Sequence, residues 1–532
     1  MGLAFNLLTE PLIQTTPCGK LTLPGVLAAL ARDEIESFPA LRPHQSMFWH
    51  MFLVQLGALA LQRGGQSEIP LTEAAWADLL RGLAPAYRDD EPWCLVVSDW
   101  SKPAFMQPPV PNGLKLANDV PTADSLDLLI TAKNHDLKQA VSREGNPQDW
   151  MFALISLQTG EGYGGAGNQG TARMNGGSSS RAMLTLAPLP QENQRVMSPR
   201  PGAWMRREIS VLLETRRKVL EDTSLNYADD GLALTWLAPW REGEQLQIDE
   251  LDIWFIEVCR RIRFTFKSSR IQAVRGTSKA TRINAKHLNG VLCDPWAPVH
   301  KTDRRSLTLG EDGDFHYATL TNLLLSGDWE APLLARPASF ETPNSRMTLM
   351  ANAIARGNSK TGGLRSRRIP ISGKALLTLG ARPAALHELA RAQAATISAF
   401  TKAISYSLAL AAAKGEKEGI KKELYSYAQS ARNSLDQFAD SIFFEHLWRR
   451  LDAQDQGQAA LRSESGEFER RLWQRTQQVF DQFLPTMPCP SLFRHRAEAR
   501  ARRALTSIIR KHYPELFERQ PEEKEAADAA GL

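Results

Sequence analysis

The sequence contains little cysteine, and what it has is scattered. The five cysteines stand far apart with no CxxC spacing: Cys18, Cys94, Cys259, Cys293 and Cys489. This pattern excludes a disulfide framework and a cysteine-rich zinc site, and it favours a reducing compartment. The first residues lack the charged leader and apolar run of a signal peptide. No apolar stretch approaches the roughly 20 residues that span a bilayer, so we expect a cytoplasmic protein without a membrane partner.

Catalytic and cofactor-binding motifs are missing as well. The ten histidines form no HExxH, HxH or HxD pairing. Residues 162–167 (GYGGAG) satisfy GxGxxG, but later glycines interrupt the helix that a dinucleotide site needs, and position 181 is not acidic. Residues 356–361 (RGNSKT) fail the phosphate-loop pattern, because no glycine directly precedes Lys360. We therefore expect no metal, no cofactor and no enzymatic activity. A cryptic nucleic-acid enzyme built from scattered His and Asp residues stays open as an alternative.

The chain does have size and helical periodicity. With 532 residues, 43% of them hydrophobic, it can bury a large core and should divide into two or more domains. Apolar residues recur at helical spacing over 384–413, 417–450, 459–484 and 489–515. We expect an α+β fold, with a large mixed N-terminal domain over 1–378, an antiparallel C-terminal four-helix bundle over 379–518, and a disordered tail over 519–532.

The N-terminal part mixes expected helices with strand-like pieces. Residues 3–16 predict a short strand and turn, and Trp150–Leu157 is apolar enough to be a strand or a helix. Thr72 is expected to introduce one of the helices, because its side chain can accept a hydrogen bond from the first turn. The helices expected here are Pro43–Arg63, Leu71–Arg81, Met205–Glu221 and Asp249–Arg263.

Positive charge is unevenly distributed, although the net charge of +5 is modest. Two segments, Val258–Cys293 and Thr342–His387, contain no acidic residue. Unpaired charge on this scale is costly unless phosphates neutralise it, so these segments predict contacts with a nucleic-acid backbone. The alternative is a solvated face whose acidic partners come from elsewhere in the fold. The predicted phosphate contacts are Arg261, Arg263, Lys267, Arg270, Arg275, Lys279, Arg282, Arg356, Arg365, Arg367 and Arg368.

Glycine is concentrated in one place. Eight glycines lie between Gly160 and Gly177, which predicts a loop rather than a helix or strand. Without Cβ atoms its backbone can approach a groove or a phosphate chain closely. Tyr163 could stack on a base, and Arg173 and Arg181 could supply charge. A flexible surface loop without a ligand is the alternative interpretation.

Eight sequence strings occur in an order that resembles one known family. They are AFNLLTEPLI (4–13), PAFMQP (103–108), LLITAKNH (128–135), GYGGAGNQGTARMNGGSSSR (162–181), WLAPW (236–240), EVCRRIRF (257–264), DPWAPV (294–299) and RGNSKTGGLRSRRIPI (356–371). Together with the C-terminal helices they extend over about 500 residues. The chain thereby resembles the CasA family, the large subunit of the type I-E CRISPR surveillance complex Cascade.

The resemblance implies a role in RNA-guided antiviral defence. Such a subunit recognises the protospacer-adjacent motif (PAM) of double-stranded DNA, while the guide RNA reads the remaining sequence by base pairing. It also starts duplex opening, contacts the displaced strand and helps recruit a separate helicase-nuclease. The other partners implied are the CRISPR RNA guide and the backbone, small and guide-end subunits of Cascade.

The resemblance also assigns DNA-binding roles to particular residues. A glycine loop enters the minor groove, a positively charged finger lies beside it, a wedge separates the first base pairs, and a further loop points toward the guide end and the PAM. The residues so assigned are Gly162, Tyr163, Gly164 and Gly165 in the glycine loop, Lys301 in the finger, Asn358, Ser359 and Lys360 in the wedge, and Lys133, Asn134 and His135 in the further loop.

Some of these assignments have alternatives. Arg304 and Arg305 are alternatives to Lys301 for the finger. At the wedge, Ser359 or a neighbour replaces the glutamine of one branch of the family, so either Lys360 or Asn358 separates the bases or duplex opening proceeds differently. A cysteine cluster that some relatives carry is missing, which again predicts no metal. A scaffold subunit that never contacts DNA is the second functional alternative.

Overall fold

The computed structural model describes residues 2–127, 145–176, 179–191, 198–357, 360–381 and 383–518, and of Lys360 only the backbone. The chain forms two compact units. Unit 1 consists of Met1–Phe315 and Gly327–Leu376, and unit 2 consists of His316–Ser326 and Leu377–Leu532. The tail expected to be disordered, 519–532, lies outside the described residues.

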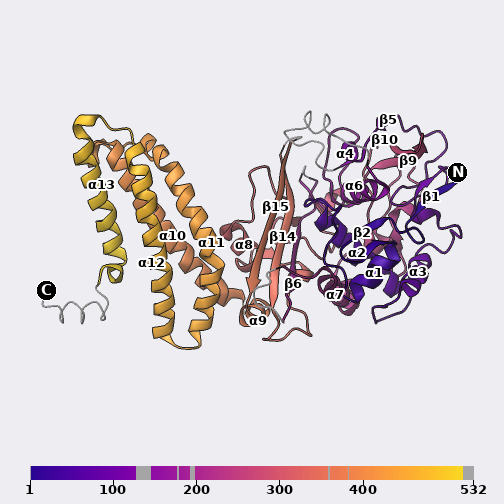
Figure 1. Cartoon of the computed structure of the whole chain (residues 1–532), viewed down its shortest axis with the longest axis horizontal. Helices are drawn as coiled ribbons and strands as arrows, with labels where there is room; N and C mark the ends of the chain where they lie inside the picture. Colours follow the sequence, from indigo (N-terminus) through magenta and orange to yellow (C-terminus); the bar gives the residue numbers. More distant parts are fainter. Residues whose placement is uncertain are drawn as a thin grey trace. The chain divides into compact units, whose positions relative to one another are not determined.

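Helices supply much of the core of unit 1 (Figure 1). The helix expected over Pro43–Arg63 is observed as α2 (Ser46–Arg63). Its residues Phe48, Phe52 and Leu56 are at most 1% exposed. The helix is apolar on nearly all sides, which suits a position where other elements surround it. Burial of its large side chains makes α2 the central element of this core.

Other helices of unit 1 also agree with the sequence. The helix α3 (Glu73–Gly82) begins after Thr72, whose side chain accepts the N–H of Ala75 at 3.4 Å, so the predicted N-cap is confirmed. The apolar stretch Trp150–Leu157 is helical, and Met205–Glu221 is a helix as expected. The remaining bounds are α1 (Leu23–Ala31), α4 (Ala123–Leu126), α6 (Pro147–Gly160) and α7 (Pro201–Asp222).

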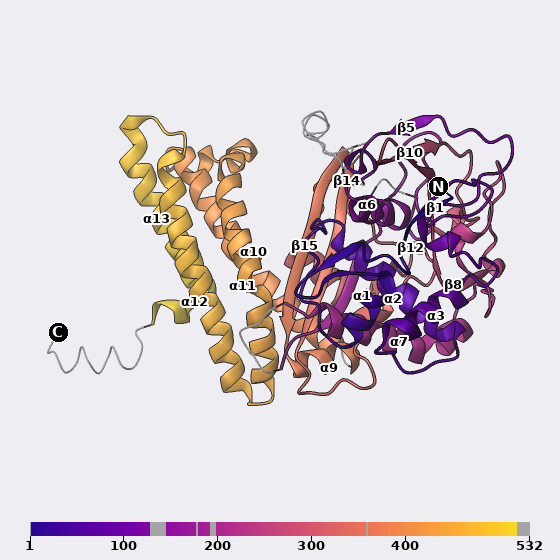
Figure 2. The same cartoon turned by 45° about the vertical axis from the view of Figure 1, so that its right-hand side comes forward.

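A long antiparallel hairpin dominates one three-stranded sheet of unit 1 (Figure 2). Its strands are β14 (Met347–Gly357) and β15 (Lys360–Ile371), and β6 (Met183–Pro188) pairs with the other edge of β14. The apolar strand β14 is buried over nearly its whole length, as the central strand of a covered sheet should be. The register shifts at Ala355/Arg356, which marks a β-bulge near the end of the hairpin.

The prediction of a helix over Asp249–Arg263 is wrong. This segment forms β8 (Leu251–Ile256) and the start of β9 (Arg261–Lys267). Every residue of β8 is buried, and a fully buried strand has no alternation of polar and apolar residues that would distinguish it from a buried helix. β9 continues through a tight turn into β10 (Arg270–Gly276), which pairs with β5 (Asn118–Val120).

The other strands of unit 1 are short. As predicted, residues 3–16 contain a strand and a turn, and a second short strand follows. The bounds are β1 (Leu3–Asn6), β2 (Ile13–Thr15), β3 (Gly19–Leu21), β4 (Cys94–Val97), β7 (Leu232–Leu234), β11 (Val299–His300), β12 (Arg305–Ser306) and β13 (Trp329–Glu330). All five cysteines lie in the described residues and are free thiols.

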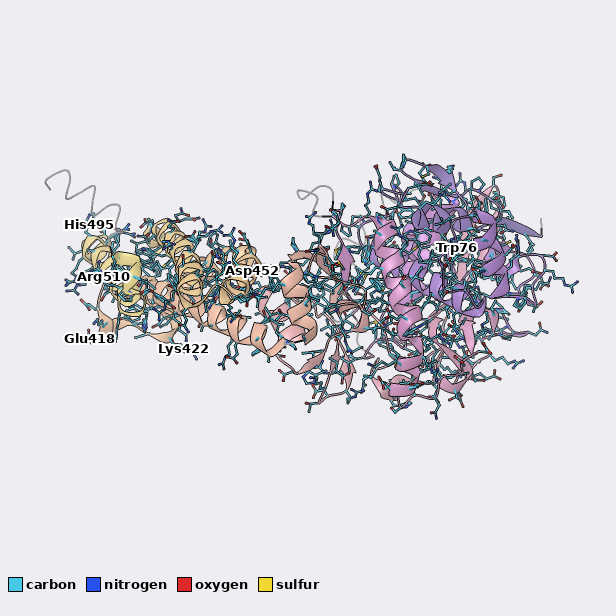
Figure 3. The ribbon with its side chains drawn as sticks, turned by 90° about the horizontal axis from the view of Figure 1, so that it is seen from below. Trp76, Glu418, Lys422, Asp452, His495 and Arg510 are labelled. Atoms are coloured by element: carbon cyan, nitrogen blue, oxygen red, sulfur yellow. The ribbon has the colours of Figure 1, made fainter. Side chains whose placement is uncertain are left out.

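Unit 2 is helical, and the labelled side chains Glu418, Lys422, Asp452, His495 and Arg510 belong to it (Figure 3). Its long helices are α10 (Pro383–Ala412), α11 (Gln429–Gln454), α12 (Gln458–Phe483) and α13 (Ser491–His512). The second begins later than expected, because residues 417–428 form 3-10 turns before it. With these helices after a mixed first unit, the expected α+β fold is confirmed.

A helix from earlier in the chain completes unit 2. This is α8 (Tyr317–Leu325), whose Tyr317 ring stacks on Phe443 of α11 with 4.4 Å between ring centroids. The N–H of Tyr317 also donates to the carboxylate of Asp440 at 2.7 Å. The helical periodicity after residue 384 gave no sign of this contribution. The helix α9 (Gly373–Ala381) precedes α10 in the chain.

Among the described residues, none of the helices combines the length and the apolar character that crossing a membrane requires.

Candidate nucleic-acid interface

The glycine-rich segment forms a defined loop between α6 and β6, which we call the glycine loop (Glu161–Gly176). Its two arms lie against each other, because the N–H of Thr171 donates to the Glu161 carbonyl at 2.9 Å. A Cβ on Gly170 would stand 2.6 Å from the Gly162 carbonyl carbon. Only glycine allows this approach of the two arms, so the composition of the loop is a packing requirement.

The tip of the glycine loop is folded and faces solvent. The N–H of Gly164 donates to the Asn168 carbonyl, and the N–H of Asn168 donates to the Gly165 carbonyl, both at 2.9 Å. Gly165 has φ of +102°, and a Cβ built on it would meet no atom within 4 Å. Tyr163 is 44% exposed. The tip therefore presents bare main chain and one aromatic ring in a fixed arrangement.

The first arm is fixed by a buried ion cluster. The Glu161 carboxylate is 6% exposed and lies 2.8 Å from Arg356 Nη1 and 3.6 Å from Arg260 Nη2. The same Arg260 nitrogen donates to the Gly162 carbonyl at 3.0 Å. Since charges this deeply buried must be paired, the cluster joins the loop to β14, on which Arg356 lies. The sequence gave no sign of this role for Glu161 or Arg260.

The second arm is fixed by another buried carboxylate and a buried arginine. The N–H of Ala172 donates to both Glu257 oxygens, at 2.7 and 2.9 Å. Burial raises the pKa of Glu257 to about 7. Arg173 is 2% exposed and donates to three main-chain carbonyls, among them Leu292 and Ile253, each at 3.1 Å. Burial lowers the pKa of Arg173.

The suggestion that Arg173 and Arg181 supply charge to a ligand is therefore wrong. Arg181 is also 2% exposed, and its guanidinium forms a bidentate ion pair with Asp294 at 2.5 and 2.9 Å. Both guanidinium groups are buried and bonded inside the protein, so neither can reach a phosphate. Their role is to hold the base of the glycine loop.

The residue chosen for the finger lies at the end of a small hairpin. Lys301 and Arg304 are exposed in the turn between β11 and β12. Lys301 has no ion pair among the described residues, whereas Arg304 lies 3.4 Å from Glu330 and Arg305 lies 3.2 Å from Asp303. Of the three finger candidates, Lys301 is thus the cation without an acidic partner.

The finger hairpin lies beside the glycine loop. The Asn175 side chain donates to the Ser306 carbonyl of β12 at 3.3 Å. A Cβ on Gly290 would stand 2.5 Å from the carbonyl carbon of Met174, so the turn preceding β11 packs directly on the loop. The Leu309 N–H, just beyond β12, donates to Ser179 Oγ at 3.0 Å. These contacts bring together segments more than 100 residues apart.

The wedge assignment falls on the end of the β14–β15 hairpin. Asn358, Ser359 and the side chain of Lys360 lie outside the described residues, as do Lys133, Asn134 and His135. The strands on either side are described: Gly357 pairs with Lys360, and Arg356 pairs with Thr361. Because Arg356 also binds Glu161, the end of this hairpin and the glycine loop share one buried anchor.

Burial divides the predicted phosphate contacts into two groups. Arg261, Arg263, Arg282 and Arg356 are buried and donate to main-chain carbonyls or to carboxylates. Arg263 is fully buried, with carbonyls of Val97 and Asp99 each at 3.1 Å, and burial lowers its pKa to about 10. Burial likewise lowers the pKa of Arg282 to about 10. These positions do not fit phosphate contacts, because the guanidinium groups are already occupied inside the fold.

The remaining basic residues are more accessible. Arg365 and Arg367 are half-buried and donate to main-chain carbonyls, among them Gly313 at 3.0 Å and Phe315 at 2.9 Å. Arg275 is also half-buried. The exposed members are Lys267, Arg270, Lys279 and Arg368. Exposed basic side chains are therefore present, but they are fewer than the sequence suggested.

No set of three or more His, Cys, Asp or Glu side chains within the described ranges is arranged to hold a metal ion.

Solved structures share this fold over nearly the whole chain. CRISPR-associated protein Cse1 from Acidimicrobium ferrooxidans has a TM-score of 0.64 at 16% identity, with 96% of this chain and 99% of that chain covered. CasA (Cse1) from Thermus thermophilus has a TM-score of 0.59 at 14% identity, with 96% and 99% covered. Cse1 from Thermobifida fusca has a TM-score of 0.59 at 13% identity, with 96% and 98% covered.

The chain therefore has the Cse1 fold, and the resemblance seen in the sequence strings is confirmed at the level of the fold. No protein-family model and no curated protein matches the sequence.

Proposed function

We propose that this chain, which has the Cse1 fold, is the large subunit of a type I-E Cascade complex and recognises the PAM of double-stranded DNA. In this role it is a binding module without chemistry of its own. It acts in the cytoplasm with the CRISPR RNA guide and the backbone, small and guide-end subunits. It starts duplex opening and helps recruit a helicase-nuclease. Guide pairing then reads the target beside the PAM.

One observation carries the proposal: two hairpins distant in sequence from the glycine loop are each bonded to it. Glu161 binds Arg356 at the end of the β14–β15 hairpin, and Asn175 binds Ser306 of the finger hairpin. These contacts thus connect the bare main chain of the glycine loop, the finger hairpin with Lys301 and the end of the β14–β15 hairpin. Together they would form one surface for DNA. A merely structural glycine loop would not need two hairpins bonded to it.

The physical chemistry of this surface suits the minor groove. The groove is only about 6 Å wide, so main chain without Cβ atoms enters it more easily than bulky side chains do. Gly164 and Gly165 supply such main chain at the tip, and Lys301 supplies an ammonium group for the adjacent phosphates. Minor-groove hydrogen bonding distinguishes few sequences, so tolerance of several PAM sequences is expected. The end of the β14–β15 hairpin is then the wedge that enters the opened step.

Gly165→Asp tests the proposal. The new carboxylate would face phosphates, and we expect PAM-dependent binding by the reconstituted complex to weaken about tenfold or more, because like charges at an interface cost several kcal/mol. Gly65→Asp is the matched control, since Gly65 also has a positive φ (+63°) and open space around its Cα. Binding is measured with labelled duplexes that carry either a permitted or a scrambled PAM.

The result also separates the alternatives. If Gly165→Asp assembles normally and discriminates PAM sequences as well as the unchanged protein, the chain is a scaffold without DNA readout. If the purified chain cleaves DNA with Mg²⁺ or Mn²⁺, and a point mutation abolishes that cleavage, it is an enzyme and the proposal is wrong.

A further inference from the structure

A largely apolar cavity of about 380 Å³ lies within unit 1. Its lining includes Met183, Met350 and Asn352 of the β6–β14–β15 sheet, His50 of α2 and Trp204 of α7. The volume falls in the range of about 300–1,000 Å³ that is typical of small-molecule sites. No residue of the glycine loop or of the finger hairpin, both of which the structure describes, lines this cavity. It is therefore separate from the surface proposed for DNA.

Asn352 is a polar residue in the apolar wall of this cavity. It is 7% exposed, and its side-chain amide makes no hydrogen bond among the described residues. The amide is nevertheless not sealed from solvent, as the unpartnered hydroxyl of Thr348 on the same strand is. The small accessible surface of Asn352 therefore includes its amide and opens into the cavity that the residue lines. A group inside the cavity must supply the hydrogen-bond partners of this amide.

His50 offers a second polar atom to the cavity. Its Nε2 lies 2.9 Å from the carboxylate of Glu208, which is fully buried. Because an ionised carboxylate only accepts, Nε2 carries the proton, and Nδ1 of the neutral ring is left as an acceptor. Nδ1 has no partner among the described residues and, like the Asn352 amide, is not sealed from solvent. Stacking on Trp204, with 3.6 Å between ring centroids, fixes the orientation of the imidazole.

These groups favour a flat ring with adjacent hydrogen-bond donors and acceptors. An Asn amide can pair through two hydrogen bonds with the 6-amino group and N7 of adenine, and a neutral imidazole nitrogen can accept another N–H. Trp204 is partly exposed, and a hydrogen bond from its Nε1 to Glu208 at 2.8 Å holds its ring in place. An aromatic surface of this kind stabilises a base by stacking.

The opening of the cavity carries one charge of each sign. Arg368 and Glu36 line the cavity and are both exposed, so they lie where it meets solvent. Arg368 makes one hydrogen bond among the described residues, from Nη1 to Ser198 Oγ at 2.8 Å, and its other nitrogens are available. Arg368 is also one of the phosphate contacts predicted from the sequence. A phosphate attached to a base in the cavity would find its cation there.

We propose that this cavity binds the adenine base of a nucleotide, with the base paired to the Asn352 amide and the phosphate toward Arg368. A 6-oxo purine presents two neighbouring acceptors, O6 and N7, in place of the donor and acceptor of adenine. The amide oxygen of Asn352 and Nδ1 of His50 would then face an acceptor, so the site selects adenine over hypoxanthine and guanine.

Asn352→Leu tests the inference, because leucine has nearly the shape of asparagine and lacks its amide. We expect the full-length chain with Asn352→Leu to bind AMP roughly 10- to 100-fold more weakly in calorimetric titrations, as for the loss of a bidentate pair with a base. Its melting temperature without ligand should stay the same or rise, since the amide has no partner in the protein. Thr348→Val is the matched control: Thr348 is also a buried polar residue of β14, but it does not line the cavity.

Changes in the ligand separate the contributions of the base and the phosphate. The unchanged protein should bind AMP roughly tenfold or more tightly than IMP, whose base carries O6 in place of the amino group. Arg368→Met should weaken AMP roughly fivefold or more, as for the loss of one hydrogen bond to a charged group, and should leave the affinity for adenosine unchanged. The comparison of AMP with IMP uses the unchanged protein, so it decides even if a variant fails to fold.

A strand of nucleic acid and a free nucleotide are the two possible sources of the base. Titration with AMP is compared with titration by a short single-stranded deoxyadenosine oligomer. Binding of AMP that Asn352→Leu weakens identifies a site for free nucleotides. Binding of the oligomer alone, weakened equally by Asn352→Leu, identifies a site for a base that a strand presents.

Three results would overturn the inference: no binding of AMP or of the oligomer, equal affinity for AMP and IMP, or equal affinity of Asn352→Leu and the unchanged protein. None of them bears on the proposed function, which Gly165→Asp tests with a different ligand at a different surface. Conversely, normal PAM discrimination by Gly165→Asp would leave the adenine site in place.

Discussion

At the scale of single residues, the charges counted in the sequence divide according to burial. Arg263 was expected to contact phosphates, but it donates to the carbonyl of Val97, which is 166 positions away. Arg282 likewise binds carbonyls of Pro239 and Ala238. A basic segment without acidic residues suggests an exposed cationic surface. A guanidinium can instead donate to main-chain carbonyls, and such partners cannot be recognised in a sequence because they carry no charge. Residue counts therefore overestimated the cationic surface.

Glu257 shows a second feature that the sequence could not reveal. Burial raises its pKa from 4.5 to about 7, so the folded protein binds this proton more tightly than the unfolded chain does. The stabilising contribution of the proton is complete below about pH 4.5 and is lost as the pH rises through about 7.

Glu257→Gln should remove this pH dependence. The glutamine oxygen can still accept the Ala172 N–H, but the side chain cannot titrate. Between pH 5 and pH 8, we expect the unchanged protein to lose on the order of 1–3 kcal/mol more stability than the variant, as judged from urea unfolding at a series of pH values. Parallel curves for the two proteins would contradict the expectation.

Glu242→Gln is the control for that experiment. A hydrogen bond from Arg261 lowers the pKa of Glu242, so its stabilising contribution is present above about pH 4.5 and is lost as the pH falls through the lowered pKa. The substitution should therefore change the curve only in the acid range.

At the scale of elements, periodicity identified helices well and buried strands poorly. The long helices α7, α10, α12 and α13 lie where apolar residues recur every three or four positions. The strand β8 (LDIWFI) is buried on both faces and lacks any alternation, so it was assigned to a helix. The β14–β15 hairpin was not predicted, and only its end was assigned, as the wedge, because the pairing partners of its strands cannot be read from one segment alone.

The buried link between that hairpin and the glycine loop makes a testable prediction. Arg356→Met removes the ion pair at 2.8 Å and leaves the Glu161 carboxylate with Arg260 at 3.6 Å. We expect the two arms of the loop to separate more often, so the amide of Thr171 should exchange hydrogen about tenfold faster or more. Mass spectrometry of deuterated protein measures this rate.

Arg365→Met provides the comparison for that variant. Arg365 lies on the same hairpin, but it donates to the carbonyls of Gly313 and Glu311 and not to the glycine loop. Its substitution should leave exchange at Thr171 unchanged. Equal exchange at Thr171 in both variants would show that the Glu161 cluster does not support the loop.

At the scale of the whole molecule, the ordered strings led to the correct fold although identity to the solved structures is only 13–16%. Short strings such as DPWAPV and EVCRRIRF stand where the fold is most constrained: they contain Asp294, Glu257 and Arg260, the buried charges that hold the glycine loop. The sequence strings identified these positions, but only the structure shows which partners these charged side chains bind.

The exposed cations of unit 1 predict how binding responds to salt. Lys267 and Lys279 are exposed and have no ion pair among the described residues. If both meet phosphates, replacing both by alanine should reduce the slope of log affinity against log salt by about 1.8, or about 0.9 for each contact. Titrations of target DNA with the reconstituted complex at several salt concentrations measure the slope. Lys218→Ala on α7 should leave it unchanged, and an unchanged slope in the double variant would exclude both contacts.

The position of α8 has a consequence for any attempt to divide the protein. Residues 316–326 belong to unit 2, although the chain on both sides of them belongs to unit 1. A protease cut near residue 376 would therefore not release two independent fragments, because Tyr317 would still hold the first fragment to Phe443 of the second. A recombinant fragment that begins at residue 377 would expose the surface that α8 normally covers. During synthesis, α8 can pack on its partner α11 only after α11 has emerged, long after α8 itself.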